Sequence, residues 1–159
     1  MATPQRTPRN TRKTPAAPAT GEYGHLQPQA PELEEVVLGA LMIESDAYSQ
    51  VSDILKPESF YEHRQQLLYR AITTLALQQK PIDILTVTEQ LRSTGDLEEA
   101  GGPFYITQLS GKVASSAHIE YHARIIAQKH LARELITYTS TIQTKAFDET
   151  QDVDDLMQE

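Results

Sequence analysis

Residues 116–147 read SAHIEYHARIIAQKHLARELITYTSTIQTKAF and contain neither glycine nor proline. Such a stretch predicts one helix, roughly 45–50 Å long at about 1.5 Å per residue. Helices average roughly 11–12 residues, so this one is longer than a small domain needs. Ser115 or Ser116 can cap its first turn. A helix that extends past its own core usually meets a partner, and the rest of the chain is interpreted around that expectation.

Apolar side chains in the second half of this helix recur at intervals that match the seam of a coiled coil. Ile119 and Ile126 come earlier at heptad spacing and could be covered by the helices that precede them. The apolar side chains from Leu131 onward lie too far along the helix to be covered by those preceding helices. Burying four such side chains is worth about 6–10 kcal/mol before entropy. We therefore predict a protein interface formed by Leu131, Leu135, Tyr138 and Ile142.

The composition changes after the first thirty residues. Residues 1–30 hold five of the nine prolines and four basic residues, and they offer few large apolar side chains. We expect them to form a disordered tail rich in proline and arginine. The whole chain has a net charge of −8, so its acidic remainder is a poor surface for binding duplex DNA. Weak binding of nucleic acid by the basic tail is the alternative.

The chain contains no cysteine, which excludes disulfides and zinc sites with cysteine ligands. No apolar run approaches the roughly 20 residues needed to span a bilayer. The N-terminus lacks the apolar core of a signal peptide. We therefore expect a soluble cytoplasmic protein with no membrane partner.

Residues 31–114 carry the signals of an all-α globular subdomain. Apolar residues recur with the helical period, and prolines and glycines separate the segments. We found no alternating segment of useful length that would predict a β-strand. We expect a compact bundle of about six short helices, of which the clearest segments are residues 31–44, a short one after Ser45 or Asp46, 59–79, 85–93 and 103–110.

Some residues of this bundle have specific predicted roles. Gly39 would cost about 1 kcal/mol relative to alanine inside a helix, so it indicates a close approach of two helices. Asp83 is expected to cap the helix that follows it, and Gly95 to supply the left-handed residue after that helix ends. Leu85 and Phe104 are expected to face the core.

The sequence lacks the patterns of a catalytic or nucleotide-binding site. A P-loop needs G-x-x-x-x-G-K-[ST], whereas Gly111-Lys112 is followed by Val113 and the position five before Gly111 is Ile106. No carboxylate stands in an apolar context that would raise its pKa for acid–base work. We expect this chain to contain no catalytic residue and no cofactor-binding residue.

The histidines do not predict a metal site. His118 and His122 lie four positions apart, a spacing that can bind a metal, but the residue after His118 is isoleucine rather than glutamate and no third ligand is in view. A solvated or partly packed pair is the better interpretation. His63 is expected to make a local hydrogen bond, and His130 to lie on a polar face.

Many short segments along residues 31–147 follow, in register, the order found in one known family. The matching positions are Leu38-Gly39-Ala40-Leu41, Leu55-Lys56-Pro57-Glu58-Ser59-Phe60-Tyr61, His63, Ala71-Ile72, Leu75, Pro81-Ile82-Asp83, Thr86-Val87, Leu91, Leu97-Glu98, Gly101-Gly102, Tyr105, Leu109, Tyr121, Ile125-Ile126, Arg133 and Leu135-Ile136. This order resembles the N-terminal domain of bacterial replicative DNA helicases of the DnaB family. The number of segments in register carries the assignment, since no single motif decides it.

The resemblance implies a helical globule followed by a helical hairpin, with hairpins of neighbouring subunits paired. Three such dimers would form a collar above a ring of six ATPase domains, and the collar would dock DNA primase. The parent enzyme would use ATP and magnesium to unwind duplex DNA while threading single-stranded DNA through its ring.

The chain departs from the family pattern at its end. It stops at Glu159 with no ATPase domain, so residues 115–159 are expected to hold the long helix and the truncated start of the second hairpin helix. We therefore expect this chain alone not to be an enzyme. The alternative is a stand-alone helical adaptor that binds another protein, and a P-loop encoded downstream of Glu159 would separate the two.

Overall fold

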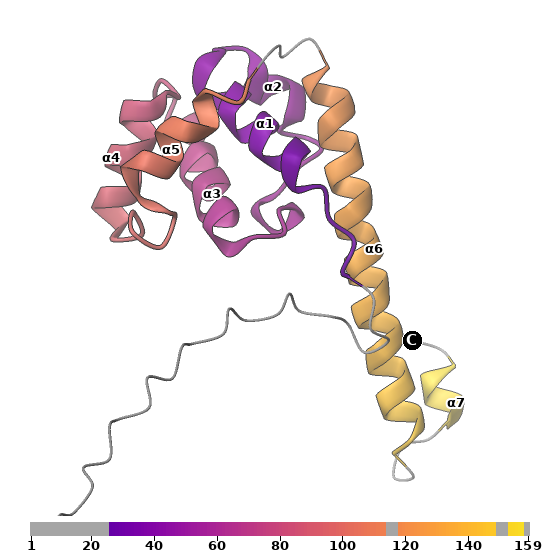
Figure 1. Ribbon diagram of the computed structural model, residues 1–159. Coiled ribbons are helices and arrows are strands. Elements are labelled where there is room, and N and C mark those ends of the chain that lie inside the picture. The colour runs from indigo at the N-terminus through magenta and orange to yellow at the C-terminus, as the bar shows by residue number, and fades with distance from the viewer. Residues whose placement is uncertain (1–25, 114–117, 149–152, 158–159) are drawn as a thin grey trace, which may run out of the picture.

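The computed structural model describes residues 26–113, 118–148 and 153–157. Figure 1 shows a group of short helices beside one end of a long helix that continues well beyond them. No β-sheet is present in the described part of the chain, so the all-α prediction is confirmed. The elements are α1 (Pro31–Ile43), α2 (Ala47–Val51), the 3-10 helix η1 (Pro57–Ser59), α3 (His63–Leu77), α4 (Ile84–Thr94), α5 (Gly102–Ser110), α6 (Ile119–Ala146) and α7 (Val153–Leu156).

The globule, residues 31–113, is built around α1 and α3. In α1 the side chains from Val37 to Met42 are all buried, because α3, α5 and α6 contact it on different sides. Gly39 permits the closest of these approaches. A Cβ added to Gly39 would lie far inside contact distance of the Leu109 carbonyl oxygen and 2.7 Å from Val113 Cγ2. The predicted close helix approach is confirmed.

The start and end of α4 follow the local sequence signals. Asp83 Oδ1 accepts a hydrogen bond of 2.9 Å from the Thr86 amide, and Thr86 Oγ1 accepts one of 2.9 Å from the Asp83 amide. This reciprocal arrangement is a capping box. Gly95 follows the helix with φ +82°, a left-handed conformation that glycine adopts without strain. Both predictions are confirmed.

Other predicted helix starts need correction. Asp46 occupies the cap position of α2, but its side chain makes no capping hydrogen bond. The helix α3 begins at His63 rather than near Ser59, because residues 57–59 form η1 and Phe60 is extended (φ −80°, ψ 142°). The predicted caps of the long helix, Ser115 and Ser116, lie outside the described residues.

Leu85 and Phe104 do not face the core, contrary to expectation. Both side chains are 81% exposed. Successive residues of a helix are about 100° apart, so Leu85 lies about 200° from the buried Val87, and Phe104 lies about 200° from the buried Ile106. Each therefore faces away from the side of its helix that packs.

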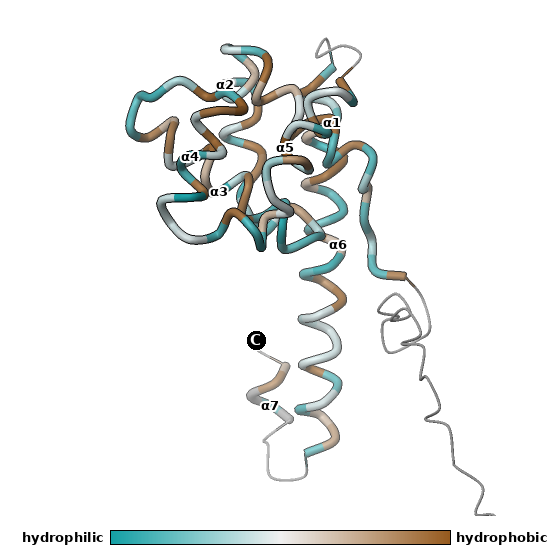
Figure 2. The backbone as a smooth tube through the Cα atoms, turned by 60° about the vertical axis from the view of Figure 1, so that its left-hand side comes forward, coloured by the Kyte–Doolittle hydropathy of each residue, from teal (hydrophilic) through white to brown (hydrophobic). Residues whose placement is uncertain are grey.

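The long helix α6 has 28 residues and two different surroundings. Ile119, Ala123 and Ile126 are buried against the globule, chiefly α1 and α2. Past Ile126 the helix leaves the globule, with Arg133 and Glu134 still in contact with it, and α7 lies beside the far end of α6 (Figures 1 and 2). We call residues 131–146 the arm. A second hairpin helix was expected at the place where α7 begins.

Candidate protein-interaction surface

The four residues predicted to form an interface lie on one side of the arm. At about 100° per residue, Leu131, Leu135, Tyr138 and Ile142 fall within an arc of roughly 60° around α6. Leu131, Leu135 and Tyr138 are 64%, 60% and 47% exposed, and Ile142 is half-buried. We call these four residues the apolar stripe. A stripe of large apolar side chains on a helix that projects from its domain is typical of a surface that binds another helix.

A groove of about 970 Å³ lies between the arm and the globule. Tyr138 and Ile142 of the apolar stripe line its far end, so the stripe and the groove share a border. Most of the other lining residues are polar or charged types that also contribute apolar side-chain surface. They come from three places along the chain: Gln27, then Glu58, Phe60, Tyr61 and Gln66, and then His130, Arg133, Glu134, Thr137, Thr141 and Lys145.

Arg133 connects the arm to two segments of the globule side of this groove. Its Nη1 donates a hydrogen bond of 2.7 Å to the Pro28 carbonyl oxygen, and its Nη2 donates one of 2.8 Å to the Ser59 carbonyl oxygen. The guanidinium carbon lies 5.5 Å from the centre of the Tyr61 ring. Hydrogen bonds from a charged donor are roughly twice as strong as neutral ones, so Arg133 is a substantial attachment.

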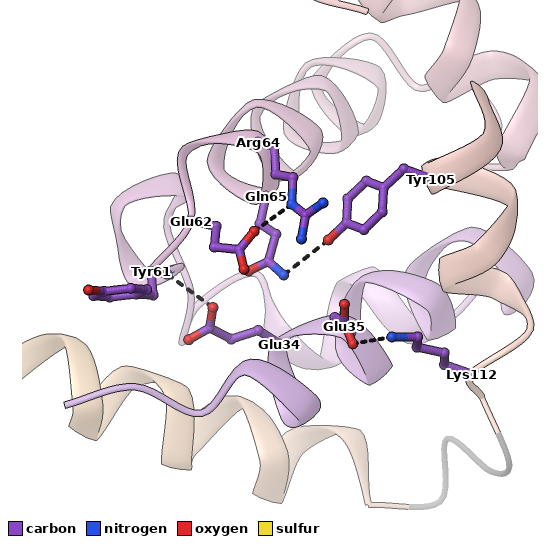
Figure 3. A network of polar contacts seen from close by, with 8 residues as sticks. All are labelled: Glu34, Glu35, Tyr61, Glu62, Arg64, Gln65, Tyr105 and Lys112. Atoms are coloured by element: carbon purple, nitrogen blue, oxygen red, sulfur yellow. Dashed lines mark hydrogen bonds and ion pairs between the residues drawn. The ribbon is translucent and has the colours of Figure 1, made fainter. Parts of the chain in front are cut away.

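Glu34, in the first turns of α1, is completely buried. Its Oε2 accepts a hydrogen bond of 3.0 Å from the Tyr61 amide (Figure 3). Its Oε1 lies 3.5 Å from the Ala30 amide. Burial raises the pKa of the Glu34 carboxyl, and the two backbone amides and the charge of Arg133 oppose that rise. The expectation that no carboxylate lies in a setting that raises its pKa was therefore wrong.

The position of Glu34 in the sequence predicted a surface role for its carboxylate rather than a buried one. An acidic residue in the first turn of a helix usually complements the helix dipole at the surface. Glu34 is buried because residues 59–61 and the segment before α1 fold over it, and neither contact can be read from the local sequence. Glu34 and Arg133 are thus the functional candidates that the sequence did not reveal as a pair.

A second polar cluster lies inside the globule (Figure 3). Gln65 of α3 is completely buried and donates a hydrogen bond of 3.2 Å to the Tyr105 hydroxyl of α5. Arg64, which is paired with Glu62, lies over the Tyr105 ring at 4.0 Å from its centre. These contacts join α3 to α5. They place no nucleophile beside a base, so the cluster has the arrangement of a structural contact.

Two histidines contact carboxylates. His63 Nε2 lies 3.0 Å from Glu99 Oε1 at the surface, a contact with a residue 36 positions away rather than the local hydrogen bond that was expected. His130 lies among polar and charged side chains of the groove, as expected, but its side chain is only 13% exposed. Its Nε2 lies 3.3 Å from Glu134 Oε1 without the geometry of a hydrogen bond, and burial lowers the pKa of its imidazole.

Two other classes of site are absent from the part of the chain that the structure describes. No group of three or more histidine and carboxylate side chains there is arranged to hold a metal ion. None of the helices described is both long enough and apolar enough to cross a membrane. The features left for function are therefore the apolar stripe, the groove and the polar contacts that join the arm to the globule.

Comparison with protein families gives a match over most of the folded region. The model of the DnaB-like helicase N-terminal domain matches residues 26–128. The chain is 47% identical over 138 residues to the replicative DNA helicase DnaB of Rhodothermus marinus, covering 87% of this chain and 15% of that protein. It is 37% identical over 134 residues to the replicative DNA helicase DnaC of Bacillus subtilis, covering 84% of this chain and 30% of that protein. The chain thus spans less than a third of the length of these relatives.

Solved structures agree with this match. The N-terminal domain of DnaB helicase from Mycobacterium tuberculosis superposes with a TM-score of 0.78 at 32% identity, covering 82% of this chain and 92% of that one. A DnaB-like replicative helicase whose structure concerns its interactions with primase superposes with a TM-score of 0.69 at 20% identity, covering 81% of this chain and 30% of that one. The second likeness supports the fold alone.

Proposed function

This chain belongs to the family of DnaB-like helicase N-terminal domains, and from that membership we propose that it is the assembly and primase-docking domain of a hexameric replicative DNA helicase. Its role is to bind other proteins during DNA replication in the cytoplasm. ATP, magnesium and single-stranded DNA act elsewhere in the parent helicase, at its ATPase domains. This chain alone performs no catalysis.

The exposed apolar stripe carries the proposal. Three of its four side chains lie between 47% and 64% exposed on a helix that projects from the globule. Leaving them in water forgoes about 1.5–3 kcal/mol for each side chain that could be fully buried. Pairing with the second helix of the hairpin, and then with the hairpin of a neighbouring subunit, would recover much of that energy. Three such pairs would complete the collar of the hexamer.

DNA primase is the second proposed partner. One structural neighbour is described by its interactions with primase, and its fold matches this chain over most of the length. We propose that primase binds the collar built from this domain.

Sedimentation equilibrium tests the assembly role. The chain should self-associate at micromolar concentration, and the double variant Leu131→Ser/Leu135→Ser should weaken that association by at least about tenfold, because it removes two large apolar contacts. The matched control is Leu85→Ser/Phe104→Ser, which changes two equally apolar and more exposed side chains on the globule. A chain extended beyond Glu159 should be measured beside it, since a longer second helix would strengthen pairing.

Two results would overturn the proposal. One is a strict monomer at high micromolar concentration for both chain lengths. The other is equal loss of association in the stripe variant and in the globule control, which would mean that exposed apolar area in general, rather than the apolar stripe, drives association.

A further inference from the structure

Glu34 and Arg133 come from different helices but contact the same two stretches of backbone. One stretch is residues 28–30, just before α1, and the other is residues 59–61, from the end of η1. Glu34 accepts hydrogen bonds from the amides of both stretches, and Arg133 donates hydrogen bonds to carbonyl oxygens of both. The Glu34 carboxylate thus binds backbone N–H donors of both stretches, and the Arg133 guanidinium binds backbone carbonyl acceptors of both. We call Glu34, Arg133 and these two stretches the Glu34–Arg133 junction.

The Glu34–Arg133 junction contacts α6 at the start of the arm. Ile126 is the last buried residue of α6 in the described part of the chain, and Arg133 lies seven residues beyond it, at the start of the arm. Lys56 and Glu134 add a contact of 3.6 Å nearby, but both side chains are more than half exposed, and such pairs contribute little. Arg133 is therefore the strong polar attachment at the point where the arm leaves the globule.

Polar and apolar contacts constrain a helix differently. The buried side chains of Ile119, Ala123 and Ile126 hold α6 against the globule, but apolar contact is non-directional and permits small tilts. The planar guanidinium of Arg133 binds two carbonyl oxygens in fixed directions. About 20 Å of helix follow Arg133, at about 1.5 Å per residue. A tilt of roughly 10° at the junction would therefore move the end of the arm by about 3–4 Å.

We propose that the Glu34–Arg133 junction sets the direction in which the arm leaves the globule, and that Arg133 is a positioning residue for the apolar stripe. The functional meaning of this direction rests on the proposed assembly role, whereas the direction itself does not. Loss of Arg133 would leave two carbonyl oxygens without their donor and would remove a positive charge that favours the buried Glu34 carboxylate, a costly change. The two stretches and the arm would then separate or shift.

A distance measurement within one chain tests this directly. The chain has no cysteine, so Ser93→Cys at the end of α4 and Thr144→Cys in the arm provide two unique positions for nitroxide labels. Both residues are exposed, and their hydroxyls bond only to carbonyls of their own helices. Pulsed electron–electron double resonance then reports the distribution of globule-to-arm distances. Dilution with excess unlabelled chain removes distances between molecules.

The expected result is a narrow distribution for the parent chain and one at least about twofold wider for Arg133→Met, because methionine keeps an apolar stem but makes neither hydrogen bond. Arg133→Lys should give an intermediate width, since a single ammonium cannot reproduce the planar fork. The matched control is Arg124→Met on the same helix. Within the described residues Arg124 pairs with Glu120 alone, one turn earlier, and both are exposed, so this variant should keep the parent distribution.

A parent-like distribution in Arg133→Met, with helical content retained by circular dichroism, would overturn the proposal. If Arg133→Met does not fold, the test uses Arg133→Lys, and a parent-like distance distribution in that variant would overturn the proposal. A widened distribution together with no self-association of the parent chain would retain the junction and reject the assembly role. Normal self-association of the parent chain, together with an unchanged distance distribution in Arg133→Met, would retain the assembly role and reject the junction. The two proposals therefore fail independently.

Discussion

Residues 119–128 and the arm belong to one uninterrupted helix, yet only the first of these regions is surrounded by its own chain. Ile119, Ala123 and Ile126 are buried against the globule, whereas Leu131 and Leu135 are mostly exposed. The first region therefore contributes to the folding of this domain, and the second has apolar surface to offer to a partner. The difference shows that the length of a helix and the extent of its own core are set by separate parts of the sequence.

The largest expected effect is a contrast between two isoleucines of α6. Ile126 is completely buried, and Ile136 in the arm is 39% exposed. Ile126→Ala should lower the free energy of unfolding by about 2–5 kcal/mol, because it removes buried methyl groups and leaves a cavity. Ile136→Ala should change it by only about 0.5 kcal/mol in the monomer. Urea unfolding at a protein concentration too low for self-association measures both changes in the free energy of unfolding. Equal losses in the two variants would contradict the difference between the two regions.

A second prediction concerns the close approach of α1 and α5 inside the globule, against which the first half of α6 also packs. Gly39→Ala should destabilise the globule by about 1–3 kcal/mol, since the new methyl group would collide with the backbone of α5 at Leu109. Gly111→Ala is the matched control. Its φ of −75° suits alanine, and the nearest atom to the added Cβ is 3.5 Å away. Thermal unfolding monitored by circular dichroism distinguishes the two, and a tolerated Gly39→Ala would contradict the close approach.

The third prediction uses the buried carboxylate where the arm begins. The folded state raises the pKa of Glu34 above its ordinary value of 4.5, so folding favours the protonated form. As the pH falls through the folded pKa toward 4.5, the chain should gain stability from this group, and the gain is complete below 4.5. Glu34→Gln has no such proton to bind. The stability of the parent relative to this variant should therefore increase as the pH falls.

Urea unfolding of both chains between about pH 7 and about pH 5 measures this difference. His130 acts with the opposite sign. Burial lowers its pKa from 6.5, so its contribution to stability is present above 6.5 and is lost as the pH falls through the folded pKa. Because His130 is present in both chains, subtraction removes its effect. A difference that stays constant across this range would contradict a carboxylate whose pKa is raised by burial.

Local signals in the sequence were enough to place most helices. The absence of glycine and proline over residues 116–147 predicted α6, and the Asp83 cap and Gly95 predicted both ends of α4. These features depend on contacts within a few residues, which is why the sequence displays them. Gly39 was informative for a related reason, because a glycine in the middle of a helix is costly unless another backbone lies close.

Contacts between residues far apart in the sequence could not be predicted from these local signals. Glu34 is buried by backbone from two distant stretches, and Arg133 meets carbonyl oxygens 105 and 74 residues away in the sequence. The exposure of Leu85 and Phe104 was missed because apolar residues near a helix start can belong to either side of a short helix. The apolar stripe was predicted from spacing, and its binding role remains a prediction.

The smallest expected effect refines the comparison between the two regions of α6. Arg124 lies in the first region but faces solvent and pairs with Glu120 at 2.7 Å, with both side chains more than half exposed. Arg124→Met should therefore cost only about 0.3–0.5 kcal/mol, the usual contribution of an exposed pair one helical turn apart. Arg133→Met, in the arm, should cost more, because it breaks two hydrogen bonds from a charged donor. If urea unfolding gives this order, the side of α6 that a residue occupies, rather than the half of the helix, determines its contribution to the fold. The reverse order would mean that the arm is held to the globule by something other than the Glu34–Arg133 junction.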